Sequence, residues 1–186
     1  APDVAESVAL FLNQAAGNPG RGGHRLTVAA SRVVEGARED VASLLGGDPE
    51  RTVFGPGATY WINSVLASRL KAGDRVVTTS LEHNAVMRPL HWFEKKRRIK
   101  LVTIKGRSSD AVPSVDEIVA SVTRATTSLV VMTHASNVTG CVLPVADTGR
   151  RLREAIDGTG DTSAGQLLKL GEETLEHWVI ARAFDP

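Results

Sequence analysis

The chain has 186 residues, of which 42% are hydrophobic and 23% charged, with a formal net charge of +1. This length is enough for one domain with a substantial core or for most of a larger one, and the composition excludes a chain that is disordered throughout. The nearly balanced charge disfavours nucleic acid or an acidic membrane surface as a partner, and no stretch approaches the ~20 apolar residues of a membrane span.

Cys141 is the one cysteine of the sequence, so no disulfide can form within the chain. The N-terminus also lacks the basic and then apolar pattern of a signal peptide. The predicted location is therefore the cytoplasm, where thiols stay reduced. We assign no metal ligands.

The N-terminal part of the chain predicts two helices separated by a loop. Apolar residues recur at helical spacing from Val4 to Leu12 and again from Val28 to Leu45. The loop from Gly17 to Arg25 is rich in Gly and Pro. Its backbone N–H groups and basic side chains suit an anion, but a flexible connector fits the same composition, so both interpretations stay open.

A predicted short strand, 52–54, leads into the turn Gly57-Ala58-Thr59, and a helix follows the turn. A strand, a glycine-containing turn and a helix together offer free N–H groups and the positive end of a helix dipole to a phosphate. The turn is not a Walker loop, because no Gly-Lys-Ser/Thr follows it, and no G-x-G-x-x-G opens the helix. The stretch is a candidate anion site.

Strands and helices then alternate along the chain. In chain order the sequence predicts strand 75–79, helix 85–96, strand 99–104, a capped helix from Ser114 to about Val122, strand 128–132 and helix 145–156. This alternation is typical of an α/β fold whose sheet is mainly parallel and is sandwiched by helices. After Ile156 no apolar run supplies the next strand, and the last predicted element is a helix from about Glu172 to Ala183.

Three polar clusters lie just past predicted strands: Gly57-Ala58-Thr59, Glu82-His83-Asn84 and Ser136-Asn137-Val138-Thr139-Gly140. In an open α/β sheet, ligands bind in the crevice outside the carboxyl ends of the strands. The sequence therefore predicts one ligand site assembled from three separated pieces of chain.

These clusters, with Asn18-Pro19-Gly20-Arg21-Gly22-Gly23-His24 before them, carry a resemblance to a known family. Over about residues 4 to 156 their order and spacing resemble the cysteine desulfurase branch of the class V aminotransferases. Proteins of this family are pyridoxal-phosphate enzymes of the aspartate-aminotransferase-like fold (fold type I), usually homodimers. The resemblance implies that residues 1–156 are a partial pyridoxal-phosphate-binding large domain and that 157–186 are a divergent tail.

The resemblance assigns the cofactor residues at matching positions. Gly57, Ala58 and Thr59 match the turn that holds the cofactor phosphate. His83 matches the imidazole that stacks on the pyridine ring and assists proton transfer, so it is the predicted catalytic residue. Asn137 matches the amide that hydrogen-bonds the phenolic oxygen of the cofactor. The chemistry agrees, since a dianion suits N–H groups at a helix N-terminus and an aromatic cofactor suits a flat ring over its face.

The resemblance breaks where the family reaction needs two further groups, a Schiff-base lysine and an aspartate paired with the pyridinium nitrogen. Ser163-Ala164-Gly165 looks like a remnant of the aspartate motif, but Asp161 falls one place too close and the family glutamine is missing. The only lysine after Lys105 is Lys169, which lacks the family's preceding histidine and its spacing. We interpret Lys169 as an ordinary residue.

Further departures concern the turn and the two ends of the chain. Gly57 and Tyr60 stand where Asn and Glu are usual in the family, which weakens the expected phosphate site. The family's N-terminal Asn-Ala-Ala turn and its C-terminal small domain, with the substrate-binding arginine, are not found. The family's persulfide-forming cysteine belongs to that C-terminal part, so Cys141 does not correspond to it.

The sequence leaves functions of two classes open. The first is a truncated relative of a cysteine desulfurase or class V aminotransferase that keeps part of the site and binds pyridoxal phosphate weakly or has lost it. Without the lysine it is inactive alone; if active, it would act on an amino acid. The second is a cofactor-free scaffold or interaction domain that dimerises through the inherited fold. Another phosphate ligand at the turn, or a fragment of a complete pyridoxal-phosphate enzyme, are further alternatives.

Overall fold

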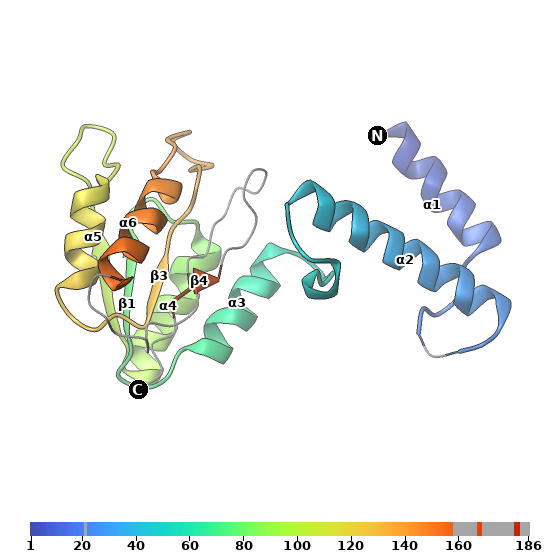
Figure 1. Ribbon diagram of the computed structural model, residues 1–186, viewed down its shortest axis with the longest axis horizontal. Helices are drawn as coiled ribbons and strands as arrows, with labels where there is room; N and C mark the ends of the chain where they lie inside the picture. The colour runs from blue at the N-terminus through green and yellow to red at the C-terminus, as the bar shows by residue number, and fades with distance from the viewer. Residues whose placement is uncertain (21, 158–166, 169–180, 183–186) are drawn as a thin grey trace. The chain divides into compact units, whose positions relative to one another are not determined.

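The computed structural model describes residues 1–20, 22–157, 167–168 and 181–182. The chain divides into two compact units, Ala1–Phe54 and Gly55–Pro186. The first unit consists of helix α1 (Pro2–Gln14), helix α2 (Arg25–Leu44) and the short 3-10 helix η1 (Pro49–Arg51), as Figure 1 shows. The structure confirms the two helices that the spacing of apolar residues predicted in this part of the chain.

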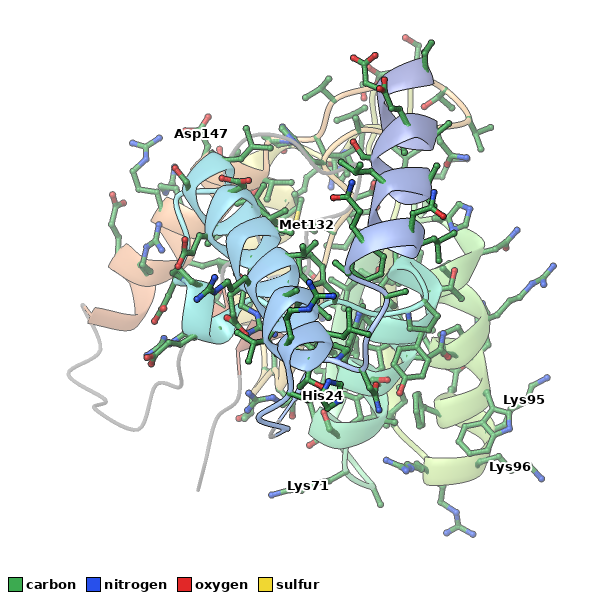
Figure 2. All side chains as sticks on the ribbon, turned by 90° about the vertical axis from the view of Figure 1, so that its right-hand side faces the viewer. His24, Lys71, Lys95, Lys96, Met132 and Asp147 are labelled. Atoms are coloured by element: carbon green, nitrogen blue, oxygen red, sulfur yellow. The ribbon has the colours of Figure 1, made fainter. Side chains whose placement is uncertain are left out.

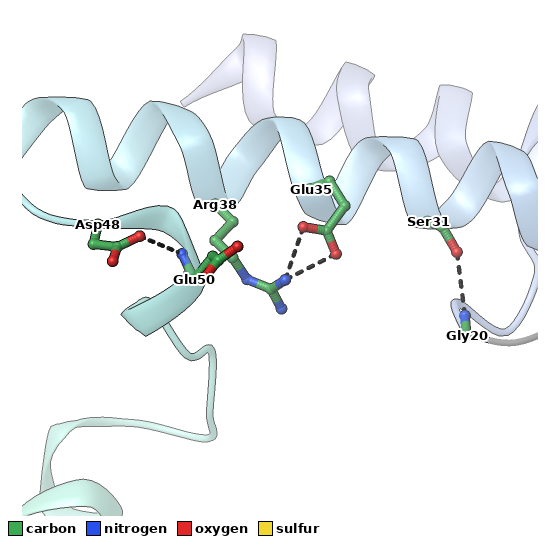
Figure 3. Close-up of polar contacts among 6 residues, drawn as sticks. All are labelled: Gly20, Ser31, Glu35, Arg38, Asp48 and Glu50. Carbon is green, nitrogen blue, oxygen red and sulfur yellow. Dashed lines mark hydrogen bonds and ion pairs between the residues drawn. The ribbon is translucent and has the colours of Figure 1, made fainter.

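The loop between α1 and α2 is tied to α2. The amide of Gly20 donates to Ser31 Oγ at 3.1 Å, a contact drawn in Figure 3. His24 is the N-cap of α2, and its ring contacts Thr27 through both nitrogens. Because the imidazole of His24 is engaged by the first turn of its own helix, these contacts favour the connector interpretation of this loop.

The second unit is an α/β structure. Its elements are α3 (Ala58–Arg69), β1 (Arg75–Thr79), α4 (Asn84–Arg97), β2 (Lys100–Ile104), α5 (Val115–Thr123), β3 (Leu129–Val131), α6 (Val145–Asp157), β4 (Leu167–Leu168) and β5 (Ala181–Arg182). Three of the strands form a parallel sheet in the order β2-β1-β3, and β4 pairs antiparallel with β5. The predicted α/β class with a parallel sheet between helices is confirmed.

Each strand sends alternate side chains to opposite faces of the sheet, and each face has its own core. In β1, Val76 packs with α3 and α4, whereas the next residue, Val77, packs with α5 and α6. Leu129 and Val130 of β3 divide between the two cores in the same way. Helices thus cover both faces of the sheet, and β3, whose three residues are all buried, is a continuous apolar run in the sequence.

Two capping contacts fix helix ends in this unit. Ser114 and Glu117 form the predicted capping box at the start of α5. On the opposite face of the sheet, Arg97 Nη1 of α4 donates to the carbonyls of Ala67 and Leu70 at 2.9 and 2.8 Å, where α3 ends. The guanidinium also lies 4.8 Å from the ring centroid of Phe93. Arg97 therefore holds the C-terminal ends of α3 and α4 side by side.

Two predicted elements differ from the structure. Residues 52–54 are neither strand nor helix, and Val53 and Phe54 are 63% and 47% exposed. Short β-branched and aromatic segments form strands only against a partner, and no described strand pairs with this one. The helix predicted from Glu172 lies mostly outside the described residues, but at its end Ala181 and Arg182 pair with β4 as a strand.

We predict that Arg97→Ala lowers the free energy of unfolding by about 1–3 kcal/mol, because two charge-assisted hydrogen bonds and a cation–π contact are lost. Lys96→Ala removes a neighbouring exposed cation and should change it by less than about 0.5 kcal/mol. Urea unfolding of the two variants makes the comparison. Equal losses would show that the α3–α4 contact at Arg97 contributes no stability.

Candidate functional site

The parallel sheet brings two of the three polar clusters to the same edge. β1 ends at Thr79, which is in register with Ile104, and the last pair joining β1 to β3 is Thr78 with Val131. His83 follows the end of β1 and Asn137 follows the end of β3. Because neighbouring parallel strands end at the same edge, both residues lie at the carboxyl edge of the sheet.

The third cluster reaches this edge through helix α3. Both α3 and α4 lead into the start of a parallel strand, β1 and β2 respectively, so both run back along the sheet against the strand direction. Arg97 joins the C-terminal ends of the two helices. Their N-terminal ends, at Gly57 and His83, therefore face the carboxyl edge of the sheet together.

Gly57 is the N-cap of α3 and has φ 147° and ψ 168°, a conformation that glycine adopts almost alone. No side chain of the described residues caps the helix. Ala58 and Thr59, in its first turn, are exposed. The first amide N–H groups of a helix have no partner within it, so this end presents open donors and a positive dipole. Close by, a Cβ on Gly55 would collide with the indole of Trp61.

His83 is held by the start of α4. It is the N-cap, with its Nδ1 accepting a hydrogen bond from the amide of Ala85 at 3.0 Å. Because Nδ1 is an acceptor there, the neutral ring carries its proton on Nε2. The half-buried imidazole thus has a fixed orientation before any ligand arrives.

Asn137 lies in a turn whose backbone is closed by internal bonds. The amide of Gly140 donates to the carbonyl of Ser136 at 2.8 Å, and the amide of Ser136 donates to the carbonyl of Cys141 at 2.9 Å. Further out from the turn, the amide of Leu143 bonds the carbonyl of His134 at 2.8 Å. Asn137 itself is exposed at the tip. The turn presents the amide side chain of Asn137 on a short, well-braced loop.

Glu82 is the residue whose part the sequence did not reveal. Its Oε1 accepts hydrogen bonds from Thr79 Oγ1 at 2.7 Å and from the amide of Thr133 at 2.8 Å. Its Oε2 is buried without a hydrogen-bond partner among the described residues. Burial raises the pKa of Glu82 to about 7, although both hydrogen bonds lower it. The only signal in the sequence was a carboxylate placed directly beside His83 at a strand end.

These residues fit pyridoxal phosphate in part. The uncapped N-terminus of α3 suits the phosphate, and the anchored imidazole and exposed amide suit a planar ring with an oxygen substituent. The sequence candidates for the other groups, Asp161 and Lys169, lie outside the described residues.

The Aminotransferase class-V family profile matches residues 1–159. The chain belongs to this family, which is pyridoxal-phosphate-dependent. A cysteine desulfurase from Nostoc sp. is 33% identical over 156 residues, which are 82% of this chain and 38% of that protein. A selenocysteine lyase from Bos taurus is 27% identical over 173 residues and also matches 82% of the chain and 39% of its own length.

Solved structures of a cysteine desulfurase and of a NIFS-like protein show the same fold. The apo cysteine desulfurase from Thermococcus onnurineus NA1 superposes with a TM-score of 0.72 at 27% identity, covering 81% of this chain and 38% of that one. A NIFS-like protein gives the same TM-score at 29% identity, covering 82% of this chain and 42% of that protein. The chain thus spans about two fifths of the relatives it matches, and fold type I is confirmed.

Lys95 and Lys96 are exposed in the last turn of α4 and project outward, away from the N-terminal end of that helix, so they carry no part of this site (Figure 2). Among the described helices, none is long and apolar enough to span a membrane.

We predict that Gly57→Ala destabilises the chain by about 1–3 kcal/mol, because an L-residue is strained at this φ and ψ. Gly36→Ala is the matched control: it lies inside α2, where a Cβ meets open space, and should stabilise by up to about 1 kcal/mol. Thermal unfolding of both variants distinguishes a conformational requirement at Gly57 from a general effect of the added methyl group.

From the raised pKa of Glu82 we predict that the stability of the folded chain depends on pH. A raised pKa means that the folded chain binds the proton more tightly than the unfolded chain, so stability falls as the pH rises from 4.5 to about 7. The loss is at most roughly 3 kcal/mol. His83 is the titratable neighbour of Glu82 in the sequence, His134 follows Thr133, whose amide donates to Glu82, and Lys105 follows the end of β2.

Glu82→Gln mimics the protonated side chain and should remove this part of the pH dependence. Urea unfolding of the wild-type chain and of the variant at pH 5.5 and 8 measures it. The variant should be the more stable of the two at the higher pH. An equal loss of stability between pH 5.5 and 8 in the wild-type chain and in the variant would show that the pH dependence does not come from Glu82.

Proposed function

We propose that this chain forms the phosphate- and ring-binding part of a pyridoxal-phosphate site of the cysteine desulfurase type, and that it does not carry out desulfuration alone. The observation that carries this is one arrangement at the carboxyl edge of the sheet. An uncapped helix N-terminus at Gly57 faces the same edge as a histidine whose ring is already anchored.

The cofactor phosphate would be held by Ala58 and Thr59. Their amides lie in the first turn of α3, where the helix dipole favours an anion, and Gly57 leaves the approach free of a side chain. Tyr60 stands beside this turn in place of the glutamate usual in the family, and its ring forms an edge-to-face pair with Trp61, with 5.1 Å between the ring centroids. The turn therefore loses a negative charge near the phosphate.

The cofactor ring would lie against His83, with its phenolic oxygen bonded by Asn137. The hydrogen bond from Ala85 orients the imidazole, so little rotational freedom is lost when a ring stacks on it. The Nε2 proton of the neutral imidazole is the one His83 has to exchange with a substrate. Bound pyridoxal phosphate supplies an electron-withdrawing ring that takes up the electron pair released at the reacting carbon of an amino acid.

The inactivity of the chain alone is inferred from the missing lysine. Lys169 is the only lysine after Lys105, and neither its spacing nor its neighbours match the family position. Relatives named cysteine desulfurase and selenocysteine lyase extend well beyond the matched region, since the match covers 38% and 39% of their lengths. The remaining groups would belong to such further sequence.

We infer a second candidate function, self-association without a cofactor, from the first unit. Helix α1 buries no residue, and Val4, Val8 and Leu12 on it are 62%, 52% and 63% exposed. Apolar side chains gathered on one helix favour association. Light scattering tests this: a dimer supports a homodimeric scaffold, and a monomer that binds pyridoxal phosphate supports the first function only. The cytoplasmic location stays a prediction from the single cysteine.

We predict that the chain binds pyridoxal phosphate, measured by its absorbance and by quenching of protein fluorescence, and that His83→Ala weakens binding about tenfold through loss of the stacked ring. His91→Ala is the control, because His91 lies exposed on α4 and pairs with Glu94. Equal affinities of the two variants would contradict the role of His83.

A separate experiment tests the proposal that the chain lacks a lysine able to form a Schiff base with pyridoxal phosphate. Borohydride reduction followed by peptide mass spectrometry should find no lysine that carries a pyridoxyl group. A modified Lys169 would show that the chain contains the reactive lysine after all.

A further inference from the structure

Glu82 continues the link between β1 and β3 beyond the sheet. The last backbone pair between these strands is Thr78 with Val131, and there Thr78 Oγ1 also donates to the carbonyl of Val131 at 3.0 Å. Two residues past the end of β3, the amide of Thr133 donates to Glu82 Oε1 at 2.8 Å. The side chain of Glu82 thus connects the two chain segments beyond the last backbone pair of β1 and β3.

The same carboxyl oxygen is braced from β1. Thr79 is the last residue of that strand, and its Oγ1 donates to Glu82 Oε1 at 2.7 Å. Thr79 Oγ1 also accepts from the amide of Leu81 at 3.3 Å, which fixes the turn between the strand and Glu82. Oε1 therefore joins the end of β1 to the chain that leaves β3.

Each strand end continues into a residue of the proposed site. Glu82 is bonded covalently to His83, whose ring is fixed by the amide of Ala85. Thr133 begins the segment that carries Asn137, and its Oγ1 donates to the carbonyl of Ala135 at 3.1 Å. Moving Glu82 would therefore displace the imidazole and the base of the Asn137 turn relative to each other.

We propose that Glu82 is a positioning residue of the cofactor site, which sets the separation between His83 and the turn that carries Asn137. This inference rests on the proposed function. Glu82 is not a group that touches the ligand, because its Oε1 is occupied by two protein donors and its Oε2 is buried. The neutral carboxyl suits the place better than the carboxylate, since an ionised Oε2 would be buried without a donor among the residues that the structure describes.

The test compares Glu82→Gln, Glu82→Ala and the control Glu94→Gln, which makes the same change at an exposed carboxylate of α4. Glutamine keeps a carbonyl oxygen that accepts from Thr79 and Thr133, whereas alanine removes the link. Pyridoxal phosphate affinity and the visible circular dichroism of the bound cofactor are measured on the whole chain. The affinity of Glu82→Gln and of Glu94→Gln for pyridoxal phosphate should stay within about twofold of the wild-type value. Glu82→Ala should bind pyridoxal phosphate about tenfold more weakly, and the circular dichroism of its bound cofactor should disappear.

A second measurement needs no cofactor. In ¹H–¹⁵N spectra recorded as a function of pH, the Thr133 amide resonance should report the titration of Glu82. Its chemical shift should change with a midpoint at about pH 7 in the wild-type chain and show no such change in Glu82→Gln. Glu82→Ala should shift the amide resonances of both His83 and Asn137, and Glu94→Gln should shift neither.

The two measurements separate the possible failures. A chain that binds no pyridoxal phosphate but shows these spectral changes would refute the proposed function and leave the link between the two segments intact. A Glu82→Ala chain that binds as tightly as wild type, or whose His83 and Asn137 resonances do not move, would overturn the positioning role. If Glu82→Ala does not fold, loss of affinity in a folded Glu82→Gln would overturn it equally.

Discussion

The parallel pairing of β1 with its two neighbours is the interaction on which the candidate site depends. It aligns the end of β1 with the ends of β2 and β3, so that segments far apart in sequence leave the sheet at one edge. The pairing of β1 with β3 stops at Thr78 and Val131, and Glu82 extends it by accepting from Thr79 and Thr133. Without this edge, His83 and Asn137 would be unrelated surface residues.

The candidate site combines side chains and turns that are fixed by hydrogen bonds with backbone donors that are left for a ligand. His83 is oriented by a bond to its own helix, and the Asn137 turn is closed by backbone bonds. The start of α3 is the opposite case, because glycine caps it without a side chain and leaves its first donors to a ligand. Such a division suits an anionic, planar ligand, since its phosphate meets open N–H groups while its ring meets a fixed surface.

The sequence predicted the repeated elements of the second unit well, because β1, β2, β3 and the helices between them bury regular apolar patterns. It failed at 52–54, where β propensity alone does not form a strand without a partner. The clusters at the strand ends were recognised, yet the use of Glu82 was not. A carboxylate that bonds a residue 51 positions away has no local pattern to reveal it.

A ¹H–¹⁵N titration of the chain with pyridoxal phosphate tests the central claim most directly. The account predicts that the amides of Ala58 and Thr59 and those of His83 and Asn137 shift together, with one dissociation constant, and that inorganic phosphate shifts only the first pair. Shifts confined to other parts of the chain, or none at all at millimolar cofactor, would contradict it.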